Sequence, residues 1–453
     1  MDLLTTILGM GGLVWTLVFF VIALGIIVFV HEYGHYIVGR WSGIHAEVFS
    51  LGFGPVIFTR TDKRGTRWQI AAVPLGGYVK FLGDSDAASG KDVEAIAGLS
   101  DSEKRHTMYG APLWARAATV LAGPVFNFIL AGVVIFGMIL WTGIATDKPV
   151  VGSMAVMPGA SEDRAEGLQP GDAVLAINGT ETPDWESYMA AAGALPPTAR
   201  VSYTVLRNGV ETTVTSGHPL PPLVGSVQLK SAALAAGLQE GDVVLEAGGQ
   251  AVSAFAELPP IVEALAGAPV PLKIWRADGA AGQILDLTIT PNRRDLPKPE
   301  GGFETRWLIG LSAGMLFEPE VRKPGLFEAM SISVERLWFM ASMSLSSLWS
   351  VVTGAISSCN ISGAISMAQV MGQSATQGAD YYIQMLAMLS LGIGLINLFP
   401  IPVLDGGHLV FHAYEAVFGR PPHDAALRLL MTFGLALVLT FMAFALFNDL
   451  TCS

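Results

Sequence analysis

The stretch GLVWTLVFFVIALGIIVFVHEYGH, residues 12–35, joins a long apolar run to three ionisable side chains at its end. The apolar part, Gly12 to Val30, is close to the roughly 20 residues that a helix needs to cross a bilayer. If the helix continues, His31 and His35 lie on one face, because residues four apart are neighbours on a helix. Ionisable groups in a membrane span are costly, so they indicate a functional site.

The last five residues of this stretch form an HExxH motif. On a helix the two histidines can bind one zinc ion, and Glu32 between them can act as a general base toward water. The structural alternative is a pair of interfacial histidines that end a membrane-spanning helix. The cost of three ionisable groups at this place disfavours that alternative. We therefore predict that His31 and His35 bind Zn²⁺.

A catalytic zinc site usually has three protein ligands and one open position, so a third ligand is expected elsewhere. The run NLFPIPVLDGGHL, residues 397–409, ends the third apolar segment and contains Asp405. Proline breaks a helix and glycine allows close backbone approach, so this run can direct a carboxylate toward the metal. A helix cap near the interface is the alternative for Asp405, and His408 is the alternative ligand.

Two asparagines in apolar runs are further candidates. Asn397 can stabilise an oxyanion or orient the backbone of a substrate, although an interhelical hydrogen bond is the structural alternative. Pro400 and Pro402 are assigned with Asn397 to the substrate-binding or oxyanion region. For Asn127, in the run LAGPVFNF, packing or support of a metal ligand is favoured. Pro124 in the same run is expected to kink its helix.

The composition predicts a polytopic membrane protein with some soluble mass. Of 453 residues, 51% are hydrophobic and only 14% are charged, whereas soluble domains carry about a quarter charged residues. The net charge is −12 and no basic tract occurs, which argues against a nucleic-acid partner. Two cysteines cannot form a disulfide framework.

Four apolar segments are expected to span the membrane. The first is read as a retained helix and not as a signal peptide, because its n-region MDLLTT has no Lys or Arg. Basic residues in the short loops place those loops in the cytoplasm, so both termini and the long central stretch are expected outside. The expected spans run from residue 12 to 30 and lie within residues 117–143, 381–402 and 427–447.

The exterior stretch, about residues 145–323, contains an internal repeat. Gly171-Asp172 and Gly241-Asp242 are 70 residues apart, and similar residues surround both. This period is too long for a solenoid, so two tandem α+β domains are expected. Residues 46–82 have β-rich runs around a polar turn at 62–65, which predicts a hairpin. The hairpin is expected to enter the membrane interface and offer an edge strand to an unwound substrate, or merely to seal the core.

Together these elements resemble the site-2 protease family of intramembrane zinc metalloproteases. The matching runs are HEYGH at residues 31–35, AGPVFNF at 122–128 and NLFPIPVLDGG at 397–407. The resemblance implies a polytopic α-helical membrane protein with four transmembrane helices, a membrane-associated β-hairpin and two tandem PDZ-like α+β domains. It also implies that His31, His35 and Asp405 bind zinc, that Glu32 is the catalytic base and that Asn397 helps to hold substrate.

The resemblance further implies a location in the bacterial inner membrane, with the PDZ-like domains periplasmic and the active site near the cytoplasmic side. Expected partners are membrane lipid and single-span proteins such as an anti-sigma factor, and also remnant signal peptides. The PDZ-like pair is expected to act as a substrate size filter, with capture of a new C-terminus as its rival role. The expected domains are 1–40, 41–112, 113–144, 145–218, 219–293, 294–379, 380–412 and 424–449.

Two other functions are less consistent with these residues. A zinc sensor or transporter would need polar groups through the bilayer, whereas the sequence shows one cluster near one face. A membrane-anchored PDZ scaffold would not need Glu32 beside two histidines, nor Asp405.

Overall fold

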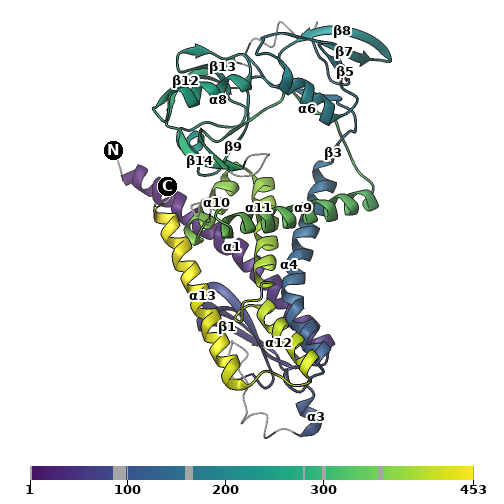
Figure 1. Ribbon diagram of the computed structural model, residues 1–453, viewed down its shortest axis with the longest axis vertical. Helices are drawn as coiled ribbons and strands as arrows, with labels where there is room; N and C mark the ends of the chain where they lie inside the picture. Colours follow the sequence, from purple (N-terminus) through teal and green to yellow (C-terminus); the bar gives the residue numbers. More distant parts are fainter. Residues whose placement is uncertain are drawn as a thin grey trace. The chain divides into compact units, whose positions relative to one another are not determined.

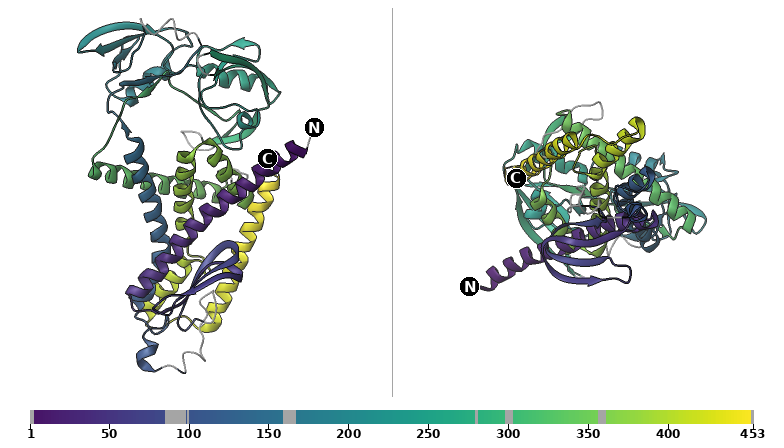
Figure 2. Two further views of the ribbon diagram at one scale, coloured as in Figure 1. Left: turned by 180° about the vertical axis from the view of Figure 1, so that it is seen from behind. Right: turned by 90° about the horizontal axis from the view of Figure 1, so that it is seen from below.

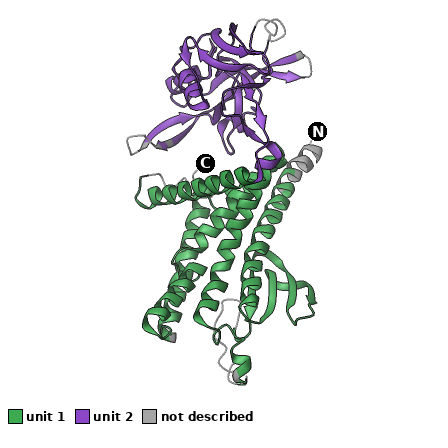
Figure 3. Ribbon diagram, turned by 90° about the vertical axis from the view of Figure 1, so that its right-hand side faces the viewer, with its two compact units in different colours: residues 1–138, 327–453 green, residues 139–326 purple. Residues whose placement is uncertain are grey.

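A computed structural model describes residues 3–84, 98, 100–158, 167–278, 281–297, 303–355 and 361–451. The chain divides into two compact units, one made of residues 1–138 and 327–453 and the other of residues 139–326 (Figure 3). The first unit holds the long apolar helices and a β-hairpin, and the second holds mostly short strands (Figure 1).

Among the described residues, four helices are long and apolar enough to cross a membrane, and each coincides with one predicted span. The four-span prediction is therefore confirmed as far as helix length and composition can test it. Shorter helices in the same unit include α3 (Asp101–Lys104), α10 (Ala364–Gln377) and α12 (Asp405–Phe418), and α9 (Leu326–Val352) begins at its boundary. The four candidate spans lie in α1 (Leu3–Trp41), α4 (Leu113–Thr142), α11 (Ala379–Asn397) and α13 (Asp424–Thr451).

Helices α1 and α4 approach closely because small residues line their contact. A Cβ atom added to Gly34 of α1 would lie 2.5 Å from the carbonyl oxygen of Ala122 in α4, so only glycine fits there. Helix α11 also packs against α4, where the Ser390 hydroxyl donates a hydrogen bond of 2.9 Å to the Asn127 carbonyl. Pro124 lies inside α4, as the sequence predicts.

The predicted hairpin forms from β1 (Ala46–Thr61) and β2 (Arg67–Phe81), which pair antiparallel beside α1 (Figure 2). The Asp62 carboxylate accepts hydrogen bonds from the backbone N–H groups of Arg64 and Thr66, and this closes the polar turn. Close to α1, Phe49 and Trp68 stack at 4.3 Å between ring centroids. Farther along, large apolar side chains are exposed, namely Phe53, Val56, Ile57, Phe58, Ile70 and Val73.

The second unit contains two four-stranded antiparallel sheets. In both, the strands lie side by side in the order second, first, third, fourth along the chain. Helix α6 (Trp185–Ala194) accompanies the first sheet. The second copy contains α7 (Ala232–Ala235), the 3-10 helix η1 (Phe255–Glu257) and α8 (Leu258–Ala264). The first sheet has the order β6 (Thr180–Glu181), β5 (Ala173–Ile177), β7 (Val201–Arg207), β8 (Val210–Ser216). The second has the order β11 (Gln250–Ala251), β10 (Val243–Ala247), β12 (Val270–Asp278), β13 (Ala281–Ile289).

Segments after the second sheet return to earlier strands of the same unit. Strand β16 (Leu311–Ala313) pairs with β9 (Val224–Val227), and β17 (Phe317–Pro319) pairs with β4 (Val151–Met154). The strand pairing of both copies thus extends beyond residue 293, where the sequence analysis ended the second domain. The remaining strands form two further pairs, β14 (Asn292–Pro297) with β15 (Phe303–Leu308) and β3 (Ile144–Ala145) with β18 (Val321–Arg322).

Candidate metal centre

Three side chains predicted as metal ligands meet inside the first unit. The Nε2 atoms of His31 and His35, on one face of α1, are 3.2 Å apart. Asp405, the first residue of α12, brings its Oδ2 to 3.2 Å from His31 Nε2 and 3.5 Å from His35 Nε2. The three side chains are at most 18% exposed. Among the described residues, this is the one cluster of three or more potential metal ligands.

The hydrogen bonds behind the histidines select the tautomers of their neutral rings. His35 Nδ1 lies 2.8 Å from the backbone carbonyl of Thr119, which can only accept, so Nδ1 carries a proton and, in the neutral ring, Nε2 holds the lone pair. His31 Nδ1 lies 3.2 Å from the side-chain amide of Asn127, whose buried Oδ1 has no partner among the described residues. Exchanging the oxygen and nitrogen of that amide gives an Nδ1–H···Oδ1 bond and satisfies both groups.

With these tautomers, three lone-pair donors face one another. Asp405 Oδ2 is buried and, within the described part of the chain, receives no hydrogen bond. Two imidazole nitrogens and a carboxylate oxygen at such short range repel each other unless a cation lies between them. Imidazole and carboxylate are ligands that zinc binds, and three protein ligands are typical of its catalytic sites. The residues therefore fit a zinc ion, and their outward hydrogen bonds orient the rings as in known zinc sites.

One face of α4 supports the two histidines. A Cβ atom added to Gly123 would lie 2.3 Å from His35 Nε2 and 2.8 Å from His31 Nε2, so a larger residue would displace both rings. Asn127, for which packing or ligand support was predicted, contacts His31 as described above. Neither Gly123 nor Thr119 is a site residue that the sequence alone predicts. Thr119 contributes only a backbone carbonyl, which leaves no signal in the residue type.

Glu32 lies beside the cluster on α1, toward the hairpin. A Cβ atom added to Gly77 of β2 would lie 3.0 Å from Glu32 Cγ, so the carboxylate side chain packs under this strand. It is close enough to interact electrostatically with His31, His35 and Asp405. This position between the metal ligands and the hairpin is compatible with a base that acts on water next to the metal.

The segment between α11 and α12 makes a tight turn that delivers Asp405. A Cβ atom added to Gly406 would lie 2.3 Å from the carbonyl oxygens of Leu398 and Phe399, so this glycine lets α12 begin against the end of α11. Asn397 is the last residue of α11 and is half-buried.

The other predicted residues of this region lie outside the three-residue cluster. Pro400 is exposed and Pro402 is half-buried, where it contacts α13 at Gly434. His408, the alternative ligand, is not part of the cluster, which contains Asp405 instead.

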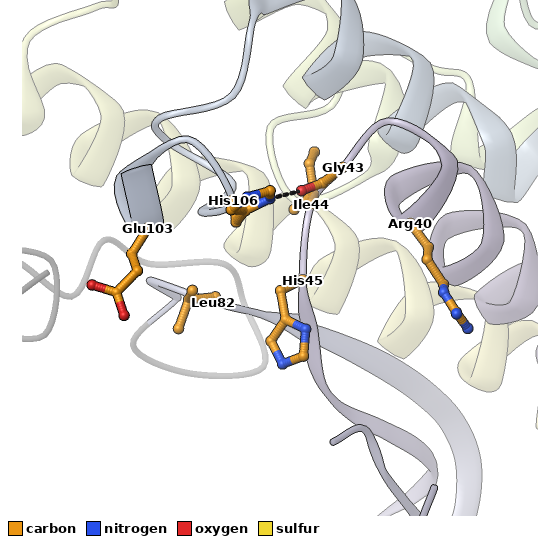
Figure 4. A pocket seen from close by; sticks show the side chains of 7 residues that line it. All are labelled: Arg40, Gly43, Ile44, His45, Leu82, Glu103 and His106. Atoms are coloured by element: carbon orange, nitrogen blue, oxygen red, sulfur yellow. Dashed lines mark hydrogen bonds between the residues drawn. The ribbon is translucent and has the colours of Figure 1, made fainter. Parts of the chain in front are cut away.

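A pocket of about 360 Å³ lies elsewhere in the same unit (Figure 4). It opens at the loop after α1, where His106 Nδ1 donates to the Gly43 carbonyl at 2.7 Å. None of the cluster residues lines this pocket, so the metal centre is identified by its donor atoms and not by concavity. The lining residues are Arg40, Gly43, Ile44, His45, Leu82, Glu103 and His106.

Comparison with known proteins agrees with this chemistry. The model of peptidase family M50 matches residues 19–441, so the chain belongs to this family of metallopeptidases. It is 33% identical to the regulator of sigma-E protease RseP of Escherichia coli, over 97% of this chain and 99% of the relative. It is 34% identical to a chain of Agrobacterium fabrum named as a zinc metalloprotease, over 99% of this chain and 98% of that relative.

These findings confirm that the protein is a zinc metalloprotease and, from its four apolar helices, a multi-pass membrane protein. The predicted resemblance to the site-2 proteases is confirmed with it, because the RseP proteins of Escherichia coli and Salmonella typhimurium align over nearly the whole chain.

Proposed function

We propose that this protein hydrolyses peptide bonds within the transmembrane helices of single-span membrane proteins, with zinc held by His31, His35 and Asp405. The observation that carries the proposal is the convergence of His31 Nε2, His35 Nε2 and Asp405 Oδ2 at the end of an apolar span. Zinc, when bound, supplies Lewis-acid polarisation of the scissile carbonyl and makes water more acidic.

The protein's own groups move the proton. Glu32 takes a proton from the attacking water and passes it to the nitrogen of the leaving amine, so that one carboxylate serves as base and then as acid. Thr119 and Asn127 keep the Nδ1 atoms of the two histidines occupied, so that both Nε2 atoms stay directed at the metal.

Asn397, Pro400 and Pro402 form the proposed substrate or oxyanion region, because they occupy the turn that ends at Asp405. The amide of Asn397 can donate to a developing oxyanion or to the substrate backbone. The hairpin β1–β2 is proposed to enter the membrane interface through its exposed apolar residues. A substrate helix must unwind before cleavage, and the edge of this hairpin can pair with the extended segment.

The proposed substrates are those that the resemblance to the site-2 proteases implies, and the name of the Escherichia coli relative, a regulator of sigma-E protease, supports the first of them. They are an anti-sigma factor in an envelope stress response and, in addition, remnant signal peptides. We propose an inner-membrane location with the metal centre near the cytoplasmic side. The two repeats, at 145–218 and 219–293 with strands β16 and β17 added, are proposed as periplasmic PDZ-like domains that exclude substrates with large exterior parts.

A cleavage assay in liposomes with Glu32→Gln tests the proposal. The substrate is a tagged single-span protein with a short exterior stub, and zinc content is measured on wild type and variant. We expect wild type to cut within the span and a chelator to stop it. Glu32→Gln should keep its zinc and lose about 10²–10⁴-fold in rate, the usual contribution of a general base. If both proteins bind zinc and neither cuts any of several such helices, the metal is structural or sensory.

A further inference from the structure

Helix α4 presents one face to the whole metal centre. Arg116, Thr119, Gly123 and Asn127 follow one another at spacings of three, four and four residues, which places them on one side of a helix. Three of them contact the histidines directly, as described above. The fourth, Arg116, contacts α12, the helix that begins with the third ligand.

Arg116 and Glu415 form a two-pronged ion pair. Nη1 and Nη2 of Arg116 donate to the two carboxylate oxygens of Glu415 at 2.9 and 2.7 Å. The side chains are only 13% and 17% exposed. The Arg116 Nε also donates to the Ala111 carbonyl at 3.2 Å, which fixes the guanidinium plane at the start of α4. Such planar pairing restricts direction as well as distance.

Helix stability does not explain this pair. Arg116 lies in the first turn of α4 and Glu415 in the last turn of α12. A positive charge at a helix N-terminus and a negative charge at a C-terminus both oppose the helix dipole. Removing two charges from water is also costly, and an apolar pair often stabilises as well or better. The pair therefore carries two energetic costs that a purely structural contact would avoid.

The pair does restrict the helix that carries the third ligand. Glu415 follows Asp405 by ten residues, which is roughly 15 Å along the axis of α12. Asp405 lies at the other end of this single helix, so a clamp at Glu415 limits both rotation and sliding of the carboxylate. A zinc–oxygen bond of about 2.0–2.2 Å tolerates little displacement. Both histidines also contact α4, through Thr119 and Asn127. One helix would therefore fix the positions of all three ligands.

We propose that Arg116 and Glu415 are positioning residues that fix α12 against α4 and thereby hold Asp405 in the zinc site. This inference rests on the proposed function, because it takes His31, His35 and Asp405 as the zinc ligands. Neither Arg116 nor Glu415 touches the reacting atoms. Their effect is to keep the Asp405 carboxylate at a fixed distance and orientation relative to the imidazoles of His31 and His35.

The test measures zinc affinity of the full-length protein in detergent by competition with a chelator, together with the visible spectrum of the Co²⁺-substituted protein. Variants are Arg116→Gln, Glu415→Gln and the exchange R116E/E415R. The exchange reverses both charges and places each in favourable orientation to its helix dipole, so the helices should remain stable. The matched control is Arg207→Gln, which breaks another two-pronged pair, with Asp172 in the second unit.

We expect each single variant to weaken zinc binding about 10–100-fold, the usual effect of losing an outer support of a metal ligand. The Co²⁺ spectrum should shift with it, because a displaced carboxylate changes the ligand geometry. The exchange variant should recover most of the affinity, and Arg207→Gln should bind zinc like wild type. If the single variants do not fold, recovery of affinity and spectrum in the exchange variant still supports the pair.

Two results would overturn the inference. Wild-type zinc affinity and spectrum in folded Arg116→Gln and Glu415→Gln would show that α12 needs no clamp, while the proposed protease function stands. A folded exchange variant that binds zinc as weakly as the single variants would show that the pairing itself is not what matters. Failure of the wild-type protein to bind zinc would instead refute the proposed function on which the inference rests.

Discussion

Buried aspartates occur in both units of the molecule, but their surroundings differ. Asp172 and Asp242 of the repeats are 1% exposed, and each carboxylate receives two hydrogen bonds from one arginine, Arg207 and Arg276 respectively, at 2.7–2.8 Å. A backbone N–H completes each set at 2.8 Å. Asp405 of the helical unit instead lies 3.2 and 3.5 Å from two imidazole nitrogens, and its buried Oδ2 has no hydrogen-bond partner among the described residues.

This difference separates a structural carboxylate from one that is prepared for a ligand. In the repeats the charge is neutralised and every short contact has a donor, so nothing remains for another group to bind. Asp405 Oδ2 has no hydrogen-bond donor among the described residues, and a metal ion can take the place of such a donor. An incompletely satisfied buried charge is costly in a folded protein, so it indicates function where a satisfied one does not.

The largest effect on zinc affinity and cleavage is expected for Asp405→Asn. An amide keeps the size of the side chain but loses the negative charge, so zinc affinity should fall by more than the 10–100-fold typical of an outer support, and cleavage should stop. Zinc competition and the liposome assay measure both effects. Hydrogen exchange in the second unit should not change. Zinc bound by Asp405→Asn as tightly as by wild type would show that another group, such as His408, is the third ligand.

Asp172→Asn makes the same chemical change at a carboxylate that already accepts hydrogen bonds from Arg207 and a backbone N–H. It leaves Arg207 without its partner, and losing one member of a buried pair costs about 3 kcal/mol, at the low end because the arginine is 22% exposed. Hydrogen exchange of strands β5 and β7 should therefore rise sharply.

Zinc affinity of Asp172→Asn should stay at the wild-type value. Asp242→Asn is the internal control and should loosen β10 and β12 instead. Unchanged protection in both variants would contradict a structural role for these pairs.

The sequence indicates which side chains gather at the candidate metal centre, because its signals are residue types at fixed spacing. HExxH at residues 31–35 places two imidazoles on one face of a helix, and the LDGG run supplies the acidic residue near glycines. The four spans follow from apolar runs whose length the bilayer fixes. These inferences need no knowledge of tertiary contacts, and the structure brings His31, His35 and Asp405 together as predicted.

Other features depend on contacts between distant segments and leave little trace in local sequence. The carbonyl of Thr119 supports His35 whatever its side chain is, and Gly123 reads as one more small residue in an apolar helix. Arg116 and Glu415 are 299 residues apart. The pairing of β17 with β4 joins segments on either side of the second repeat. Spacing rules that describe one helix or one hairpin cannot find such partners.

The smallest effect is expected at His218, whose buried Nε2 also lacks a partner among the described residues. This histidine lies between β8 and β9 and is 3% exposed. Its Nδ1 lies 3.1 Å from the backbone nitrogen of Leu220 and 3.0 Å from the Leu220 carbonyl oxygen, so its tautomer decides whether it accepts from the first or donates to the second. Burial lowers the pKa of His218 from its ordinary value of 6.5. Like Asp405 Oδ2, this buried atom could bind a ligand, or it could only make the stability of the second unit depend on pH.

We expect only the proton linkage. Because burial lowers the pKa of His218 in the folded state, the unfolded state takes up a proton more readily than the folded state as the pH falls below about 6.5. The second unit should therefore lose stability between pH 7.5 and 5.5, by less than about 1.4 kcal/mol for each pH unit.

Pulse proteolysis of the full-length protein in urea at pH 7.5 and 5.5 measures this loss. His218→Asn keeps an acceptor for Leu220 but does not titrate, so its stability should change less over the same pH range, with zinc affinity unaltered. An equal pH dependence in wild type and His218→Asn would assign the linkage to other groups. A change in zinc affinity would mean that the unpartnered atom in the second unit is also coupled to the metal centre.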